Sequence, residues 1–83
     1  MKITVIGAGY VGLVTASCFA DLGNEIICVE KIESKLEKLK KGISPIYEPG
    51  LDNILKRNIE NKRISFTSNM TEGINFSEII FFC

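Results

Sequence analysis

Three glycines near the amino terminus, Gly7, Gly9 and Gly12, have a spacing that suits phosphate binding. They follow the β-branched run Ile3–Ile6 and precede a helical pattern, which is the context of a G-x-G-x-x-G loop. In such a loop Gly7 permits a tight turn, Gly9 lets the backbone approach a pyrophosphate, and Gly12 lets the helix pack near the strands. The helix N-terminus then offers N–H groups and a positive dipole end to the phosphates. The spacing therefore predicts a dinucleotide site.

An acidic residue follows at the distance expected for such a site. Glu30 comes directly after the apolar run Ile26–Val29 and stands 18 positions after Gly12, close to the spacing of about 20 at which an acid contacts the adenosine ribose. Its carboxylate can accept hydrogen bonds from ribose hydroxyls and would repel a 2′-phosphate, so we expect NAD rather than NADP. The alternative is that the glycines serve only turn and packing and that Glu30 is a solvated strand end.

The rest of the chain alternates between strand and helix patterns. Short β-prone runs predict strands at Ile3–Ile6, Ile26–Val29, Ile64–Thr67 and Ile79–Cys83. Helical patterns run from the glycine loop to Gly23, from Ser34 to Gly42 and from Leu51 to Ile59, with a short helical turn within Ser68–Asn75. This alternation predicts an α/β fold, a Rossmann-type doubly wound parallel sheet that is incomplete, with about four strands in the order 3-2-1-4.

Two helices carry more specific expectations. In the first helix, residues at helical spacing predict the buried face, which is formed by Val11, Val14, Thr15, Cys18, Phe19 and Leu22. In the second helix, Ser34 and Glu37 match a capping box. Its apolar face is predicted at Leu36, Leu39 and Ile43. The segment ISPIYEPGL that follows is expected to be a loop because its two prolines interrupt regular structure.

Composition excludes several classes of protein. Ten basic and ten acidic residues cancel, which removes the electrostatic basis for a nucleic-acid partner. No apolar run approaches the roughly 20 residues of a membrane span. Three cysteines, with no C-x-x-C pair and no histidine, argue against a disulfide framework and against a metal site. Cys18 and Cys28 are therefore expected to be buried, reduced thiols of a cytoplasmic protein.

Two segments carry a resemblance to a known family. MKITVIGAGYVGL together with GISPIYEPGL resembles the start of the UDP-glucose/GDP-mannose dehydrogenase family, and the second motif is the more specific one. The resemblance implies that a C6 hydroxyl of a nucleotide sugar is oxidised to a carboxylate with two molecules of NAD. It also implies ribose binding at Glu30, where the family usually has aspartate, and places Lys35 near the adenosine end. The implied NAD contacts in the glycine loop are Gly7, Ala8, Gly9, Tyr10, Val11 and Gly12.

The same resemblance implies that residues 1–83 form only part of an amino-terminal NAD-binding domain, with the remainder of that domain and the substrate domain absent. No catalytic residue is expected within the chain, since the family's catalytic thiol lies beyond residue 83. Cys83 falls inside a strand pattern with no histidine to activate it. For the full-length protein we expect a nucleotide-sugar substrate and a homo-oligomer.

Two other functions remain open at this point. One is another NAD-dependent dehydrogenase of the hydroxyacyl-CoA or hydroxy-acid type, against which the SPIYEPGL loop weighs. The other is a non-catalytic module that binds NAD without turnover.

Overall fold

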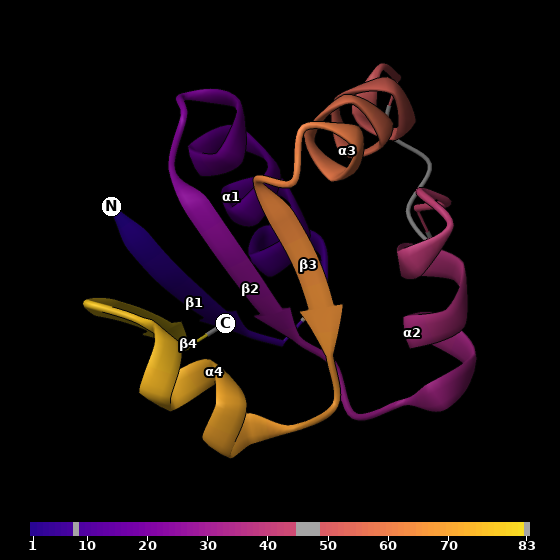
Figure 1. Cartoon of the computed structure of the whole chain (residues 1–83). Helices are drawn as coiled ribbons and strands as arrows, with labels where there is room; N and C mark the ends of the chain where they lie inside the picture. Colours follow the sequence, from indigo (N-terminus) through magenta and orange to yellow (C-terminus); the bar gives the residue numbers. More distant parts are fainter. Residues whose placement is uncertain (8, 45–48, 83) are drawn as a thin grey trace.

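The computed structural model describes every residue except 8, 45–48 and 83, and it forms one α/β unit (Figure 1). Its elements, in chain order, are β1 (Lys2–Ile6), α1 (Tyr10–Asp21), β2 (Glu25–Val29), α2 (Glu33–Lys40), α3 (Leu51–Glu60), β3 (Ile64–Thr67), α4 (Met70–Phe76) and β4 (Ile79–Phe82). Residues 45–48 of the expected ISPIYEPGL loop lie outside the described residues, as does Cys83 at the end of the predicted fourth strand.

The four strands form one parallel sheet in the order β3-β2-β1-β4. β1 is central, because Ile3 pairs with Ile26 of β2 on one side and with Ile79 of β4 on the other. The predicted fold class and strand order are therefore confirmed. Parallel strands end at the same edge of a sheet, so the residues that follow β1 and β2 meet there.

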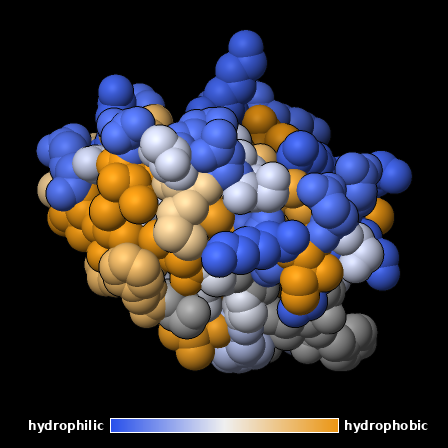
Figure 2. All heavy atoms as spheres, turned by 90° about the horizontal axis from the view of Figure 1, so that it is seen from below, coloured by the Kyte–Doolittle hydropathy of each residue, from blue (hydrophilic) through white to orange (hydrophobic). Residues whose placement is uncertain are grey.

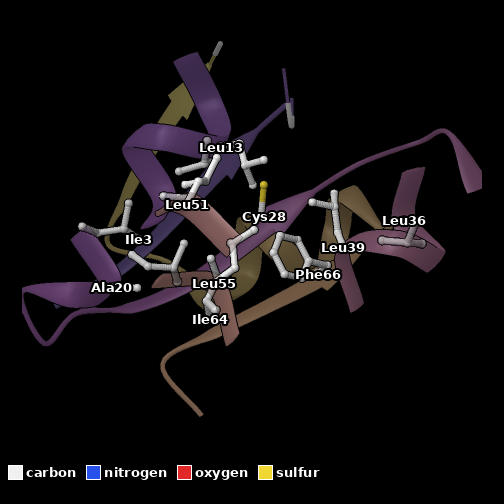
Figure 3. Close-up of a cluster of buried hydrophobic side chains, with 13 residues drawn as sticks. Ile3, Leu13, Ala20, Cys28, Leu36, Leu39, Leu51, Leu55, Ile64 and Phe66 are labelled. Atoms are coloured by element: carbon white, nitrogen blue, oxygen red, sulfur yellow. The ribbon is translucent and has the colours of Figure 1, made fainter. Parts of the chain in front are cut away.

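The main core lies on one face of the sheet, against α1, α2 and α3 (Figure 3). Side chains alternate along a strand, so Ile3 and Val5 of β1 point into this core while Thr4 between them points to the other face. The buried residues of the cluster are Ile3, Val5, Leu13, Ala16, Ala20, Ile26, Cys28, Leu36, Leu39, Leu51, Leu55, Ile64 and Phe66. The stacked rings of Phe19 and Phe81, 5.5 Å apart, extend the cluster toward β4.

The opposite face of the sheet carries only α4 in the described part of the chain (Figure 1). This helix begins after Asn69, whose side chain accepts a hydrogen bond from the backbone N–H of Glu72 at 3.1 Å. The buried hydroxyl of Thr4 donates to the carbonyl oxygen of Gly73 at 2.6 Å and joins α4 to β1. The predicted short turn is thus a capped helix of seven residues.

The predicted buried face of α1 is wrong for most of its residues, although Phe19 is partly buried against the core. The buried residues are Gly12, Leu13, Ala16, Ser17 and Ala20, whereas Cys18 is exposed. The helix carries apolar or small side chains on nearly every side, so spacing alone did not distinguish its faces. The small residues face the sheet because they let the helix approach it closely. Of the two thiols predicted to be buried, the structure buries only Cys28.

The predicted capping box of α2 is also wrong. The helix begins at Glu33, so Ser34 lies inside it, and the N-cap is Ile32 with no side-chain cap bond. The backbone N–H of Ile32 instead donates to the carboxylate of Glu30. Leu36 and Leu39 are buried as predicted, but Ile43 lies beyond the helix and is exposed.

At the amino edge of the sheet, an ion pair joins the end of α1 to α3. Nη2 of Arg57 lies 2.6 Å from Oδ1 of Asp21, and the side-chain amide of Asn58 donates to the same oxygen at 3.3 Å. The hydrogen bond from Arg57, followed by that from Asn58, holds the pKa of Asp21 below its ordinary value. The contact lies at the opposite end of α1 from the glycine loop.

Candidate cofactor site

The glycine loop begins with a turn at the end of β1. Gly7 has a φ of 99°, a left-handed conformation that favours glycine. Its backbone N–H donates to the carbonyl oxygen of Val29 at 3.0 Å. This bond ties the turn to the end of β2, immediately before Glu30. The predicted contact at Ala8 lies outside the described residues.

Gly9 is the N-cap of α1, and neither conformation nor packing explains why it is glycine. Its φ of −73° and ψ of −171° suit any residue. A Cβ built on it would meet no atom of the described residues within 4 Å. The absent side chain therefore leaves open space directly before the helix. This arrangement fits a cofactor whose phosphate comes close to the backbone.

The first turn of α1 is suited to an anion. First-turn N–H groups have no acceptor within their own helix, and α1 has neither a side-chain cap nor an acidic residue in that turn. Tyr10 and Val11 of this turn are exposed, while Gly12 is buried on the side that faces the sheet. The positive end of the helix dipole adds to the attraction for a phosphate.

Glu30 lies at the same edge of the sheet. Its backbone N–H donates to the carbonyl oxygen of Thr67 at 2.8 Å, which extends the pairing of β2 and β3 by one residue. Oε1 of its side chain accepts the backbone N–H of Ile32 at 3.1 Å, and the residue is only 7% exposed. A carboxylate has about four acceptor positions, so this bond orients the acid and leaves capacity for a ribose hydroxyl.

Lys35 lies in the first turn of α2 and is half-buried. Among the described residues it forms no ion pair with Glu30. The structure thus brings the turn at Gly7 and the acid at Glu30 together through Val29, and it places Lys35 on the following helix. Sequence reasoning missed the roles of Ile32 and Thr67 because both act through backbone atoms, which leave no signal in residue type.

The carboxyl edge of the sheet also exposes apolar side chains. Figure 2 looks at this edge from the side toward which β2 and β3 point, and orange and tan side chains gather on one part of it. Val11, at the start of α1, is 66% exposed, and Phe82, at the end of β4, is 76% exposed.

Across residues 1–7, 9–44 and 49–82, no helix is both long and apolar enough to cross a membrane.

The parallel sheet, the glycine turn after β1 and the acid after β2 define a Rossmann-type dinucleotide-binding fold. Residues 1–83 match the model of the UDP-glucose/GDP-mannose dehydrogenase family, NAD binding domain. The chain belongs to this family, and its cofactor is NAD.

Known relatives agree with this family. The chain is 48% identical over 81 residues to a UDP-glucose 6-dehydrogenase of Pseudomonas aeruginosa, and the matched segment covers 98% of this chain and 18% of the relative. It is 39% identical over 83 residues to a GDP-mannose 6-dehydrogenase of Pseudomonas putida, and this match covers 100% of this chain and 19% of the relative. The chain therefore spans about a fifth of the length of these relatives.

Solved structures agree with the fold. A GDP-mannose dehydrogenase of Pseudomonas aeruginosa, solved as a ternary complex, superposes with a TM-score of 0.97 at 36% identity, over 100% of this chain and 19% of that one. A UDP-glucose dehydrogenase of Pyrobaculum islandicum superposes with a TM-score of 0.94 at 35% identity, over 99% of this chain and 19% of that one.

Proposed function

We propose that the chain binds NAD at the carboxyl edge of its sheet. The pyrophosphate would lie over Gly7, Gly9 and the first turn of α1, near Ala8, Tyr10, Val11 and Gly12. The adenosine ribose would lie at Glu30, with Lys35 beside it. The observation that carries the assignment is the open space at Gly9, because no contact or backbone angle in the described chain requires glycine there.

Each part of the site has a separate task in this proposal. The helix terminus neutralises the phosphates, and the bond from Ile32 holds the Glu30 carboxylate in position for a ribose hydroxyl. Bound NAD accepts hydride in the reaction of a dehydrogenase. The described residues bind and orient the cofactor, and none is assigned to bond breaking.

We further propose that this chain is the amino-terminal part of a longer UDP-glucose 6-dehydrogenase that converts UDP-glucose to UDP-glucuronate. Identities of 41–49% to five UDP-glucose 6-dehydrogenases, against 39% and 36% to two GDP-mannose 6-dehydrogenases, favour this substrate. The catalytic groups and the sugar-nucleotide pocket would lie in the sequence beyond residue 83, in a homo-oligomer.

The substrate is tested on the full-length protein by following NADH formation with UDP-glucose, GDP-mannose and UDP-N-acetylmannosamine in separate reactions. Turnover should be fastest with UDP-glucose, and a clear preference for another nucleotide sugar would contradict the assignment. Residues 1–83 alone should give no NADH with any of the three. Turnover by this chain above background would show that the catalytic groups have been placed wrongly.

A further inference from the structure

Helix α4 packs on the sheet at Gly73, on the face opposite the main core. A Cβ built at this glycine would lie 2.8 Å from Cγ2 of Val29 and 3.0 Å from Cγ2 of Thr4. Both neighbours are β-branched, so their side chains have little freedom to move aside. The hydroxyl of Thr4 also donates to the Gly73 carbonyl at 2.6 Å. Position 73 therefore needs glycine for a packing reason.

Val29 joins the two parts of the candidate site, which are the glycine turn at Gly7 and the acid Glu30. Its carbonyl oxygen accepts the N–H of Gly7 at 3.0 Å, and its own peptide bond leads to Glu30. The residue is 1% exposed, so neighbouring residues enclose its side chain. A shift of Val29 away from α4 would therefore move the glycine turn relative to the ribose-binding acid.

The start of α4 is also linked to Glu30 by two hydrogen bonds that pass through Thr67. The backbone N–H of Asn69, the N-cap of α4, donates to Oγ1 of Thr67 at 3.1 Å. The carbonyl of Thr67 in turn accepts the N–H of Glu30 at 2.8 Å. The position of α4 is thus linked to Glu30 both through Val29 and through Thr67.

We propose that Gly73 is a positioning residue for the NAD site. By letting α4 contact Val29 and Thr4, it sets the separation between the glycine turn and Glu30 from the far face of the sheet, without touching the cofactor. The inference rests on the proposed placement of NAD over Gly7, Gly9 and Glu30.

The first test is Gly73→Ala in the intact protein that carries residues 1–83. NAD binding, measured by calorimetry at a temperature at which circular dichroism shows the variant folded, should weaken about tenfold, because small displacements in a preorganised site are costly. Without NAD, amide exchange at Gly7 and Glu30 should become faster. The matched control is Ile64→Val, which trims a buried residue of β3 at the amino edge of the sheet. It should leave NAD affinity within about twofold of wild type.

A rescue variant separates positioning from general loss of stability. Val29→Ala removes the Cγ2 methyl group that an alanine at 73 would meet. The double variant Val29→Ala/Gly73→Ala should therefore bind NAD more tightly than expected from multiplying the fold-losses of affinity in the two single variants. If Gly73→Ala does not fold, the double variant is compared with Val29→Ala alone. Equal or tighter binding in the double variant supports the inference, and weaker binding overturns it.

Wild-type affinity in Gly73→Ala, or multiplicative effects across the cycle, would also overturn the inference while leaving the proposed function intact. Failure of the wild-type protein to bind NAD would instead overturn the proposed function itself.

Discussion

Replacing Gly9 by valine should separate NAD binding from folding. The backbone angles of Gly9 are open to any residue, and within the part of the chain that the structure describes a new Cβ would meet nothing within 4 Å. Loss of freedom in the unfolded chain should stabilise the fold by about 0.4–1 kcal/mol. The poorer N-cap should cost about 0.5–1 kcal/mol. These terms nearly cancel, so the free energy of unfolding should change by less than about 0.5 kcal/mol.

The effect on NAD should be far larger. The branched side chain would occupy the space through which a pyrophosphate approaches the helix terminus, so we expect binding to weaken at least about a hundredfold, or about 2.7 kcal/mol. Calorimetric titration with NAD measures the affinity, and urea denaturation followed by circular dichroism measures the stability.

Gly23→Ala is the matched control with the opposite outcome. Gly23 also faces open space, but its φ is 101°, so a side chain there should cost about 1–2 kcal/mol of stability. It follows α1 at the amino edge of the sheet, so NAD affinity should not change. The reasoning fails if Gly9→Val binds NAD as wild type does, or if it loses as much stability as Gly23→Ala.

Three further outcomes are expected. The Glu30 carboxylate accepts one backbone N–H and keeps acceptor positions for a ribose hydroxyl but would repel a 2′-phosphate. The full-length protein should therefore bind NAD at least about tenfold more tightly than NADP, or about 1.4 kcal/mol, and equal calorimetric affinities would refute this. Because Arg57 lowers the pKa of Asp21 in the folded state, the stability from ionised Asp21 is present above its ordinary pKa and is lost as the pH falls below about 4. Urea unfolding across this range should therefore show a steeper acid decline in wild type than in Arg57→Gln, and parallel declines would refute the cause. The outer edge of β4 has no partner strand in the described part of the chain, so isolated residues 1–83 should self-associate. A monomer that melts cooperatively, shown by size-exclusion chromatography and calorimetry, would contradict this.

Much of the fold could be predicted from the sequence because its signals are local. The β-branched runs predicted all four strands, and glycines at positions 7 and 23 marked the turns that the structure places there with positive φ. The strand order was predicted from the order that is typical of a Rossmann-type sheet with right-handed crossovers.

The errors arose where the sequence offered equivalent choices. The α1 helix has apolar or small residues on most sides, and only contact with the sheet selects the face bearing Leu13 and Ala16. Ser34 lost its predicted capping role because the bond between Ile32 and Glu30 places the helix start before it. The packing at Gly73 depends on Thr4 and Val29, which are distant in sequence, so no local pattern could indicate it.

The unequal covering of the two sheet faces has a consequence for the order of folding. Pairing β1 with β2 joins Ile3 to Ile26, whereas pairing β1 with β4 joins Ile3 to Ile79. The longer loop costs about 1 kcal/mol more to close. In the described part of the chain, only the short helix α4 covers the face of the sheet opposite the main core. We therefore expect β4 and α4 to form last and open first, with faster amide exchange than β2, and equal protection of β2 and β4 would contradict this. Coupling between two sites is reciprocal. Bound NAD should therefore slow the opening of α4, the helix that we propose positions the NAD site.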